Sequence, residues 1–538
     1  MELMTAQMLW ANRDHRRLPL GETVLKTEVC ERYTIKEIYF NGDATADGVI
    51  RIYARLYTPS CIPTGASVVL MNDIDTPFDT TYINLLTDYG FTVLALDYGG
   101  KKEGEKFTIY PESLSGANYK DEKSDFKSFP VNPKTSCWFT YATVMLRGYY
   151  YLENQPGLDA NRICFFGVRR GAFQVYKASY VEPKASCAIA LFNSDYVPGL
   201  DVGGSEAMLY NSCIANSNYV SFSKVPTYII ESSNNNEDSL FHVNSLYLAS
   251  TDNCSYYIAE QSDNTLAPAQ RKSLLAYMNR LCFSHKAMPA CPTIEAVNEN
   301  RTLYYDVSVF GEDVESVSLY YTYGFSKGAF RNWFRLPLEK VGEGKYRAKA
   351  DVYLTKEEAS AFVTVRYASG INLSSEIITK TPYLMGVDGG EIVKKRLVYE
   401  PEMGAEPWMI TKKTDLFGEV SMQEGKSGIE GVTSSINTIT TLKIGDLHTR
   451  GERDSLLQLL VYSKEKQTIT FSVTTKEENG YCLYTHERVM PSYGEWCKIT
   501  LSADEFKSEN GPMESWANAI KFTVDSEKAL LINSLLWI

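Results

Sequence analysis

The feature that most constrains the fold is an alternation of strand-like and helix-like patterns through the first half of the chain. Residues 48–57 alternate apolar with polar side chains, and residues 67–71 and 91–97 are short apolar runs typical of buried strands. A helix-like segment, residues 81–88, separates these two runs. Strands that alternate with helices form a parallel sheet with crossover connections, so we expect such a doubly wound, mostly parallel sheet here.

The same alternation continues to about residue 288. Further strands are expected at residues 162–166, 187–192, 227–231 and 256–259, and further helices at residues 138–152, 171–179 and 268–280. We therefore assign residues 1–288 to one α/β region.

Beyond residue 288 the pattern changes to short period-two strands separated by turn residues. Residues 289–384 predict an immunoglobulin-like β-sandwich, and residues 385–538 predict a second sandwich of the jelly-roll type. A chain of 538 residues also exceeds what one hydrophobic core supports, so several domains are expected.

Composition excludes several classes of function. The formal net charge of -12 argues against nucleic acid as a partner, because nucleic-acid binders need clustered Lys and Arg. No apolar run is long enough to cross a bilayer and no signal-peptide pattern opens the chain, so we expect no membrane partner and a cytoplasmic location. The 11 cysteines are scattered without a CxxC pair, which predicts reduced buried thiols and no metal or other cofactor.

A sharp turn between a strand and a helix is predicted at residues 167–171, which read Gly-Val-Arg-Arg-Gly. In serine hydrolases of the α/β type this turn is written GxSxG, because the glycines let the backbone bend while the serine oxygen projects above the sheet. Both glycines, Gly167 and Gly171, are present, and Arg169 stands at the serine position.

The first region resembles the family of acetyl xylan esterases and cephalosporin-C deacetylases, and more broadly the dienelactone-hydrolase-like and acyl-peptidase-like branch of the α/β hydrolases. The segments that carry this resemblance are ARLYTP (54–59), VLALDYGG (93–100), FTIYP (107–111), YATVMLRGYYYL (141–152) and LDANRICFFGVRRG (158–171). The resemblance covers roughly the first half of the chain and implies an α/β-hydrolase fold.

The chain departs from the family at each position of the Ser-His-Asp triad. The resemblance places the nucleophile at Arg169, the acid at Asn235, and the histidine at Asp263, in a loop without histidine. Asn72 and Asp73 stand where related enzymes carry the His-Gly pair of the oxyanion region. A protonated arginine cannot attack a carbonyl and a carboxylate repels a developing oxyanion, so we expect the usual serine esterase chemistry to be absent.

The sequence leaves two roles open for Arg169. The first is an internal ion pair with Asp263, with Asp238 and Asp73 as the other carboxylates in reach. The second is a pocket for a small anion, formed by Arg169 with or without Arg170, because the helix that follows the elbow favours negative charge at its N-terminus.

An active esterase built from other groups is a further alternative. His242 is the one histidine near the former acid loop, and it could act with Ser232 or Ser233, or with a site completed by another chain. A lone histidine at such a position is more often structural.

The last region resembles galactose-binding-like jelly rolls, a group that includes carbohydrate-binding modules. The segments concerned are EWCKITLSADEFKS (495–508), ESWANAIKFTV (514–524) and LLINSLLWI (530–538). The resemblance implies that five aromatic residues could stack against sugar rings: Trp408, Tyr481, Tyr484, Tyr493 and Trp516. The alternative, which we favour, is that these aromatics fill the sandwich core or a domain interface.

Together these observations predict a hydrolase-fold protein without the triad, which serves in binding, assembly or regulation, with a link to carbohydrate metabolism implied by both resemblances. The expected partner is a small anionic molecule or a carbohydrate, and a homo-oligomer is compatible with the sequence. Two alternatives stand beside this prediction: a carboxylic-ester hydrolase or deacetylase with non-standard catalytic residues, and a glycan-binding protein that uses its last region.

Overall fold

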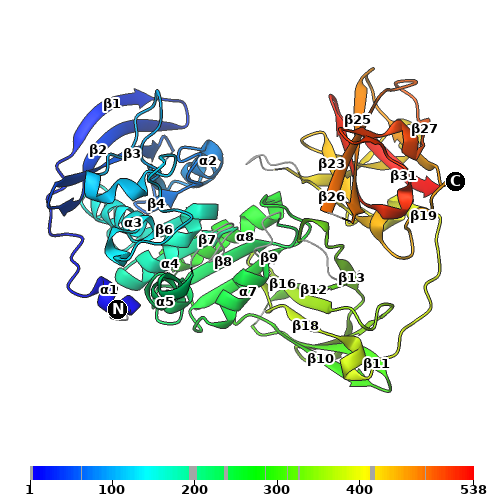
Figure 1. The fold of residues 1–538 in the computed structure, drawn as a ribbon, viewed down its shortest axis with the longest axis horizontal. Helices are drawn as coiled ribbons and strands as arrows, with labels where there is room; N and C mark the ends of the chain where they lie inside the picture. The colour runs from blue at the N-terminus through cyan, green and yellow to red at the C-terminus, as the bar shows by residue number, and fades with distance from the viewer. Residues whose placement is uncertain are drawn as a thin grey trace.

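The computed structural model describes residues 4–61, 63–192, 203–235, 240–284, 286–311, 313–324, 328–411, 418–478 and 480–538. The first region holds a large sheet with helices on both faces, and the two later regions consist of strands (Figure 1). Within these described residues, no helix has the length and apolar character needed to cross a membrane.

The first region is an α/β-hydrolase-like unit built on a nine-stranded mixed sheet in the order β1-β2-β3-β5-β4-β6-β7-β8-β9. Its strands are β1 Thr23–Val29, β2 Tyr33–Thr45, β3 Gly48–Pro59, β4 Ser67–Met71, β5 Thr92–Leu96, β6 Ile163–Val168, β7 Cys187–Leu191, β8 Thr227–Ser232 and β9 Cys254–Ala259. Strands β4 to β9 are mutually parallel and fully buried, as expected for strands covered on both faces.

The prediction of a mostly parallel sheet holds for β4 to β9, but the strand predicted at residues 48–57, which is β3, pairs antiparallel. The sequence interpretation did not predict β1 and β2. β1, β2 and β3 form an antiparallel meander, and β3 also pairs antiparallel with β5. The physical reason is the length of the connections: residues 30–32 and 46–47 are too few to carry the chain back for a parallel pairing.

Helices cover both faces of the sheet. They are α1 Ala6–Trp10, α2 Thr80–Asp88, α3 Cys137–Glu153, α4 Ala172–Val181, α5 Gly204–Cys213, α6 Ser217–Val220, α7 Leu240–Leu248 and α8 Pro268–Asn279. Helices α3 and α4 pack in one apolar core, whereas α2 and α8 pack in the core on the opposite face. The second core continues without a break into the strands of the middle region.

The middle and last regions are each built from two antiparallel sheets, an arrangement consistent with β-sandwiches. The strands of the middle region are β10 Thr293–Glu299, β11 Thr302–Ser308, β12 Val314–Tyr323, β13 Phe334–Leu336, β14 Glu339–Gly342, β15 Lys345–Ala350, β16 Ala359–Tyr367, β17 Asn372–Ser374 and β18 Ile378–Lys380. Those of the last region are β19 Leu397–Tyr399, β20 Trp408–Met409, β21 Val420–Glu424, β22 Glu430–Ser434, β23 Thr438–Thr441, β24 Leu457–Tyr462, β25 Thr468–Glu477, β26 Gly480–Val489, β27 Cys497–Leu501, β28 Lys507–Ser508, β29 Gly511–Pro512, β30 Ala519–Ser526 and β31 Leu531–Trp537. The last region has an apolar core of its own.

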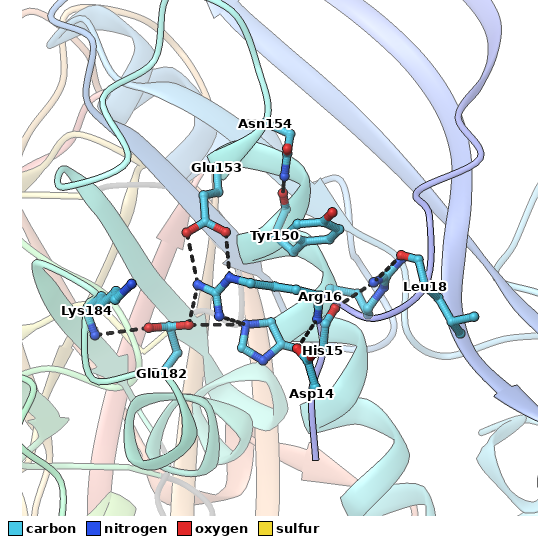
Figure 2. Close-up of polar contacts among 10 residues, drawn as sticks. Asp14, His15, Arg16, Leu18, Tyr150, Glu153, Asn154, Glu182 and Lys184 are labelled. Atoms are coloured by element: carbon cyan, nitrogen blue, oxygen red, sulfur yellow. Dashed lines mark hydrogen bonds and ion pairs between the residues drawn. The ribbon is translucent and has the colours of Figure 1, made fainter. Parts of the chain in front are cut away.

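A charged cluster ties the N-terminal segment to the ends of two helices. Arg16 lies between Glu153, at the end of α3, and Glu182, just after α4, and His15 also contacts Glu182 (Figure 2). Arg16 Nε lies 2.8 Å from Glu153 Oε2, and Arg16 Nη2 lies 2.7 Å from Glu182 Oε2. Burial opposes the ionisation of Glu182, but the hydrogen bonds from His15 and Arg16 prevail and lower its pKa from 4.5 to about 2.

Glu182 should therefore make folding depend on pH in acid solution. Because the pKa of Glu182 is depressed in the folded state, its contribution is complete above pH 4.5 and is lost as the pH falls toward 2. Glu182→Gln should lower the free energy of unfolding at pH 7 by on the order of 3 kcal/mol. Urea denaturation at several pH values measures this difference, which should shrink steadily below pH 4.5. Glu153→Gln is the matched control, with a smaller effect because Glu153 is more exposed; a loss for Glu182→Gln that does not change with pH would contradict the assignment.

Candidate functional site

The predicted strand-turn-helix elbow is present at the end of β6. Arg169 has φ +51°, a left-handed conformation that a non-glycine residue adopts only when its surroundings enforce it. A single 3-10 turn, Arg169–Gly171, then leads directly into α4. The backbone therefore presents the side chain of residue 169 at the carboxyl edge of the parallel sheet, where ligands bind in open α/β folds.

Close contacts of the backbone fix both elbow glycines. A Cβ atom on Gly167 would lie 2.5 Å from the Cα atom of Ala172, and a Cβ atom on Gly171 would lie 2.0 Å from the carbonyl oxygen of Met71. No real Cβ atom tolerates such distances, so these positions exclude every other residue as long as the turn keeps this shape.

Two guanidinium groups at the elbow face carboxylates from the end of β4. Arg169 Nη1 lies 3.6 Å from Asp73 Oδ2, and Arg170 Nη1 lies 3.2 Å from Asp73 Oδ1 and 2.8 Å from Asp75 Oδ2. Burial opposes the ionisation of Asp75, but the hydrogen bonds from Arg170 and Lys120 prevail and lower its pKa. The two guanidinium charges at the elbow are thus offset by charges of the opposite sign.

Aromatic rings hold Arg170 from the other side. Its guanidinium carbon lies 5.2 Å from the ring centroid of Tyr119 and 5.8 Å from that of Phe126, within the range of cation–π attraction. The sequence interpretation missed Tyr119, Phe126 and Asp75. Of these three, only Asp75 could have been found from the sequence, because it lies two residues after Asp73, which was predicted as a site residue.

The predicted pairing of Arg169 with Asp263 is not found: in the described part of the chain, Arg169 pairs with Asp73. Asp263 instead lies near Lys521, on β30 of the last region: burial lowers the pKa of that lysine, and the negative charge of Asp263 partly opposes this shift. The neighbouring Gln261 donates a hydrogen bond to the carbonyl of Glu406, also in the last region. The physical reason is that the loop after β9 is held by the last region and not by the elbow.

The side chains of the former oxyanion region are committed to local structure. Asn72 is buried, and its amide donates to the carbonyls of Pro77, at 3.3 Å, and Asp79, at 3.1 Å. Its own backbone carbonyl accepts a hydrogen bond of 2.8 Å from the hydroxyl of Tyr98. Asn72 therefore shapes the turn that leads into α2, while Asp73 supplies the carboxylate for the elbow arginines.

Asn235, at the former acid position, joins two loops through amide hydrogen bonds. Its Nδ2 donates to Glu231 Oε1 and to Asn264 Oδ1, both at 2.9 Å, and the backbone amide of Asn264 donates to the hydroxyl of Ser232 at 2.8 Å. Glu231 and Asn264 were not predicted as site residues. Glu231 lies in β8, and Asn264 lies in the loop after β9. In the hydrolases that the sequence resembles, the loops after these strands carry triad residues, so position alone could have indicated both residues.

The same acid loop is also bound to the middle region. Asn234 Nδ2 donates to the carbonyl of Arg331 at 2.7 Å, and Trp333 Nε1 donates to the carbonyl of Ser233 at 3.1 Å. Both contacts are buried. The loops that hold the acid and the histidine in the family thus serve here as contacts to the other two regions.

Among the described residues, no hydrogen bond joins His242 to Ser232 or Ser233. His242 lies in the first turn of α7 with an exposed side chain, whereas Ser232 and Ser233 are fully buried. The Ser233 hydroxyl donates to Asn234 Oδ1 at 2.7 Å, and the Ser232 hydroxyl lies 3.2 Å from that of Ser262. Asp238, the other predicted charge of this loop, lies outside the described residues.

The aromatic residues predicted as sugar platforms divide into two groups. Trp408 and Trp516 are buried in the core of the last region, so their faces are covered by other side chains. Tyr484 is half-buried against the same core. Tyr481 and Tyr493 are 42% and 59% exposed, and the ring of Tyr481 lies 4.6 Å from that of Phe330 in the middle region.

Three buried thiols form the one group of described residues with the donor types and spacing of a metal site. The sulfur of Cys164 lies 3.2 Å from that of Cys282 and 3.3 Å from that of Cys187. The hydrogen bond to Cys164, together with burial, raises the pKa of Cys187 well above its usual value. All three thiols lie in the apolar core that α2 and α8 share with the sheet, where they contribute to packing.

Comparison with known proteins finds similarity in solved structures alone. No family model matches the chain, and no curated protein matches it. The similar structures include an acetyl xylan esterase from Paenibacillus sp. R4, with 14% identity and a TM-score of 0.38 over 52% of this chain and 96% of that one. Acetyl xylan esterase 1 from Thermoanaerobacterium sp. JW/SL YS485 has 12% identity and a TM-score of 0.36 over 52% and 95% of the two chains. A glucuronoyl esterase from Solibacter usitatus has 12% identity and a TM-score of 0.34 over 50% and 87%.

The ion pairs at the elbow predict a specific effect of removing Asp73. Asp73→Asn should lower the free energy of unfolding by roughly 1–2 kcal/mol, because both guanidiniums lose a partly buried partner. The variant should also be stabilised by added phosphate, since a small anion can then replace the lost carboxylate. Thermal denaturation at increasing phosphate and constant ionic strength measures both effects.

Asp75→Asn provides the control, because it leaves the contact between Arg169 and Asp73 in place. Phosphate should raise the melting temperature of the Asp73 variant more than that of the wild type or the control. An equal response of all three proteins would contradict this prediction, because phosphate would then act through its general stabilising effect on folded proteins and not at the elbow.

Proposed function

We propose that this protein is a non-catalytic member of the hydrolase-fold proteins, whose first region serves as a scaffold for binding and assembly. The observation that carries the proposal is the elbow itself. Its backbone keeps the strained shape that serves a nucleophile, yet it presents Arg169, which is paired with Asp73 at 3.6 Å. A fixed positive charge in contact with a carboxylate cannot act as an attacking group.

The surroundings of the elbow support the same proposal. Acyl transfer needs a base that takes a proton from the nucleophile and donors that stabilise an oxyanion. The position of the base holds Asp263, beside Lys521, and the position of the acid holds Asn235, within an amide network. Asp73 places negative charge where an oxyanion would develop.

The former catalytic loops support a scaffolding role. The loop after β8 is hydrogen-bonded to the middle region through Asn234 and Ser233, and the loop after β9 is hydrogen-bonded to the last region through Gln261. Loops that hold catalytic groups need freedom to bind substrate and release product. Here the same loops form buried or bridging contacts that hold three regions of one chain together.

The proposal predicts that the purified protein neither hydrolyses p-nitrophenyl acetate nor reacts with a fluorophosphonate probe. Loss of a serine nucleophile alone lowers turnover by roughly a million-fold, and here no histidine assists a substitute. Arg169→Ser should remain unlabelled, because a serine without a base is not activated. Trypsin, a serine hydrolase that reacts with both reagents, is the positive control for the assay.

A burst of product or a labelled serine in the wild type would overturn the proposal. Ser232→Ala and Ser233→Ala would then identify the reacting group, and His242→Ala would test its base. Labelling abolished by one of these variants supports a working esterase with non-standard residues.

Carbohydrate binding is a second candidate function, favoured by the position of Tyr481. This residue lines a cleft of about 270 Å³ between the middle and last regions, together with Tyr323, Phe330 and Phe334. Asp446, also in the lining, accepts a hydrogen bond of 3.1 Å from the Tyr323 hydroxyl. Aromatic faces beside polar groups are the combination that stacks against and orients sugar rings.

A glycan array with the full chain tests this candidate. Tyr481→Ala should lower the signal of any bound glycan about tenfold, consistent with the loss of one stacking contact in a cleft. Tyr493→Ala is the matched control, since Tyr493 is exposed and is not part of the cleft lining. Equal loss in both variants, or no binding by the wild type, would remove the cleft from consideration.

A further inference from the structure

The two edges of the nine-stranded sheet differ in how they are covered. At one edge, β9 is shielded by β17 of the middle region, where the Ser374 hydroxyl accepts a hydrogen bond of 3.0 Å from the Ile258 amide. At the other edge, every residue of β1 is exposed, and no described strand pairs with its outer side. Figure 1 shows β1 on the outside of the first region, away from the two later regions.

Edge strands of this kind invite pairing with another strand, and proteins usually guard them with several charges or with covering loops. β1 is seven residues long and carries three exposed large apolar side chains: Val24, at 50% exposure, Leu25, at 38%, and Val29, at 80%. Its charged residues are Lys26 and Glu28, which have opposite signs and form an exposed ion pair of 2.5 Å with each other in the single chain. The strand therefore has no net charge, and a second copy of it would not be repelled electrostatically.

The hydrogen bonds of the hairpin show which backbone groups of β1 point outward. The amide of Cys30, directly after β1, donates to the carbonyl of Tyr33 at 2.9 Å, so Cys30 faces β2. Backbone groups alternate in direction along an antiparallel strand, so Glu28 and Lys26 also face β2. Thr27 and Val29 consequently turn their amide and carbonyl groups away from the sheet.

A second β1 strand fits this edge in one antiparallel register, with a twofold axis at Thr27. Thr27 then lies opposite Thr27 of the other copy, and the two residues exchange both of their outward backbone hydrogen bonds. In the same register Lys26 lies opposite Glu28 of the other copy, and Leu25 lies opposite Val29. Leu25 is the extra residue of a β-bulge against β2, so it has no partner residue in the register of the hairpin.

We propose that β1 is a self-association surface whose partner is a second copy of this chain, joined so that the large sheet runs through both copies. The sequence Leu-Lys-Thr-Glu-Val of residues 25–29 is complementary to itself when reversed, with an apolar pair at each end and an opposite charge pair inside. This symmetry is what an isologous interface requires. The inference does not depend on whether the first region catalyses a reaction.

Exchange of charges within the full chain tests the register. Glu28→Lys places Lys26 opposite a lysine of the other copy, and Lys26→Glu places two glutamates opposite each other, in both cases twice per dimer. Each single variant should raise the dimer dissociation constant about tenfold or more, since like charges directly opposite one another are unfavourable. The double variant Lys26→Glu with Glu28→Lys should restore the wild-type value, because every facing pair is again of opposite sign.

Sedimentation velocity over a range of protein concentrations provides the measurement. Thr27→Pro should also dissociate the dimer, because it removes an outward amide and leaves the amides that bond to β2. Lys123→Glu, an exposed charge change elsewhere on the first region, serves as the control. Thermal denaturation should show that all variants remain folded, as the changed side chains are exposed.

The proposal is overturned if the wild type is a monomer at every concentration, or if it associates and neither single charge variant weakens the association. It is also overturned if both single variants dissociate the dimer and the double variant fails to restore it, because the charge pairs would then not face each other in the proposed register.

Discussion

The close approach of Gly171 to the end of β4 is the constraint on which the site depends. A Cβ atom on residue 171 would lie only 2.0 Å from the carbonyl oxygen of Met71, so the elbow can exist only with glycine at this point. The same approach places the ends of two adjacent parallel strands side by side, so that Arg169, after β6, meets Asp73, after β4. One steric condition therefore fixes both the strained turn and the ion pair that occupies it.

The three regions are joined where a hydrolase of this fold would bind its substrate. Asn234 and Gln261 lie in the loops after β8 and β9, and they contact the middle and last regions respectively. These loops leave the carboxyl edge of the sheet, so any element that covers this edge closes the same space. The contacts of Asn234 and Gln261 therefore place parts of the two β-rich regions against the loops at this edge.

Much of the α/β region could be predicted from the sequence, because buried parallel strands are continuous apolar runs and the elbow glycines mark a turn of known shape. The strands β1 and β2 were not predicted, and the direction of β3 was predicted wrongly, since apolar periodicity does not report strand direction whereas short connections do. Among the carboxylates considered for Arg169, the structure places Asp73 beside it and not Asp263. The family suggested Asp263, where a histidine normally stands, but the loop that carries Asp263 is held near Lys521.

The sequence by itself determined that an arginine, Arg169, stands in the middle of a glycine-bounded turn between a strand and a helix, because residue identity and local spacing are properties of the chain alone. It also determined the order of an α/β region before two β-rich regions. Only the tertiary structure decided that Asp73 neutralises Arg169, that Trp408 and Trp516 are buried, and that β1 is left open at the edge of the sheet. These facts depend on which distant segments pack against one another. Local sequence does not specify that packing, because an apolar side chain can be buried against several surfaces and a charge can pair with several partners.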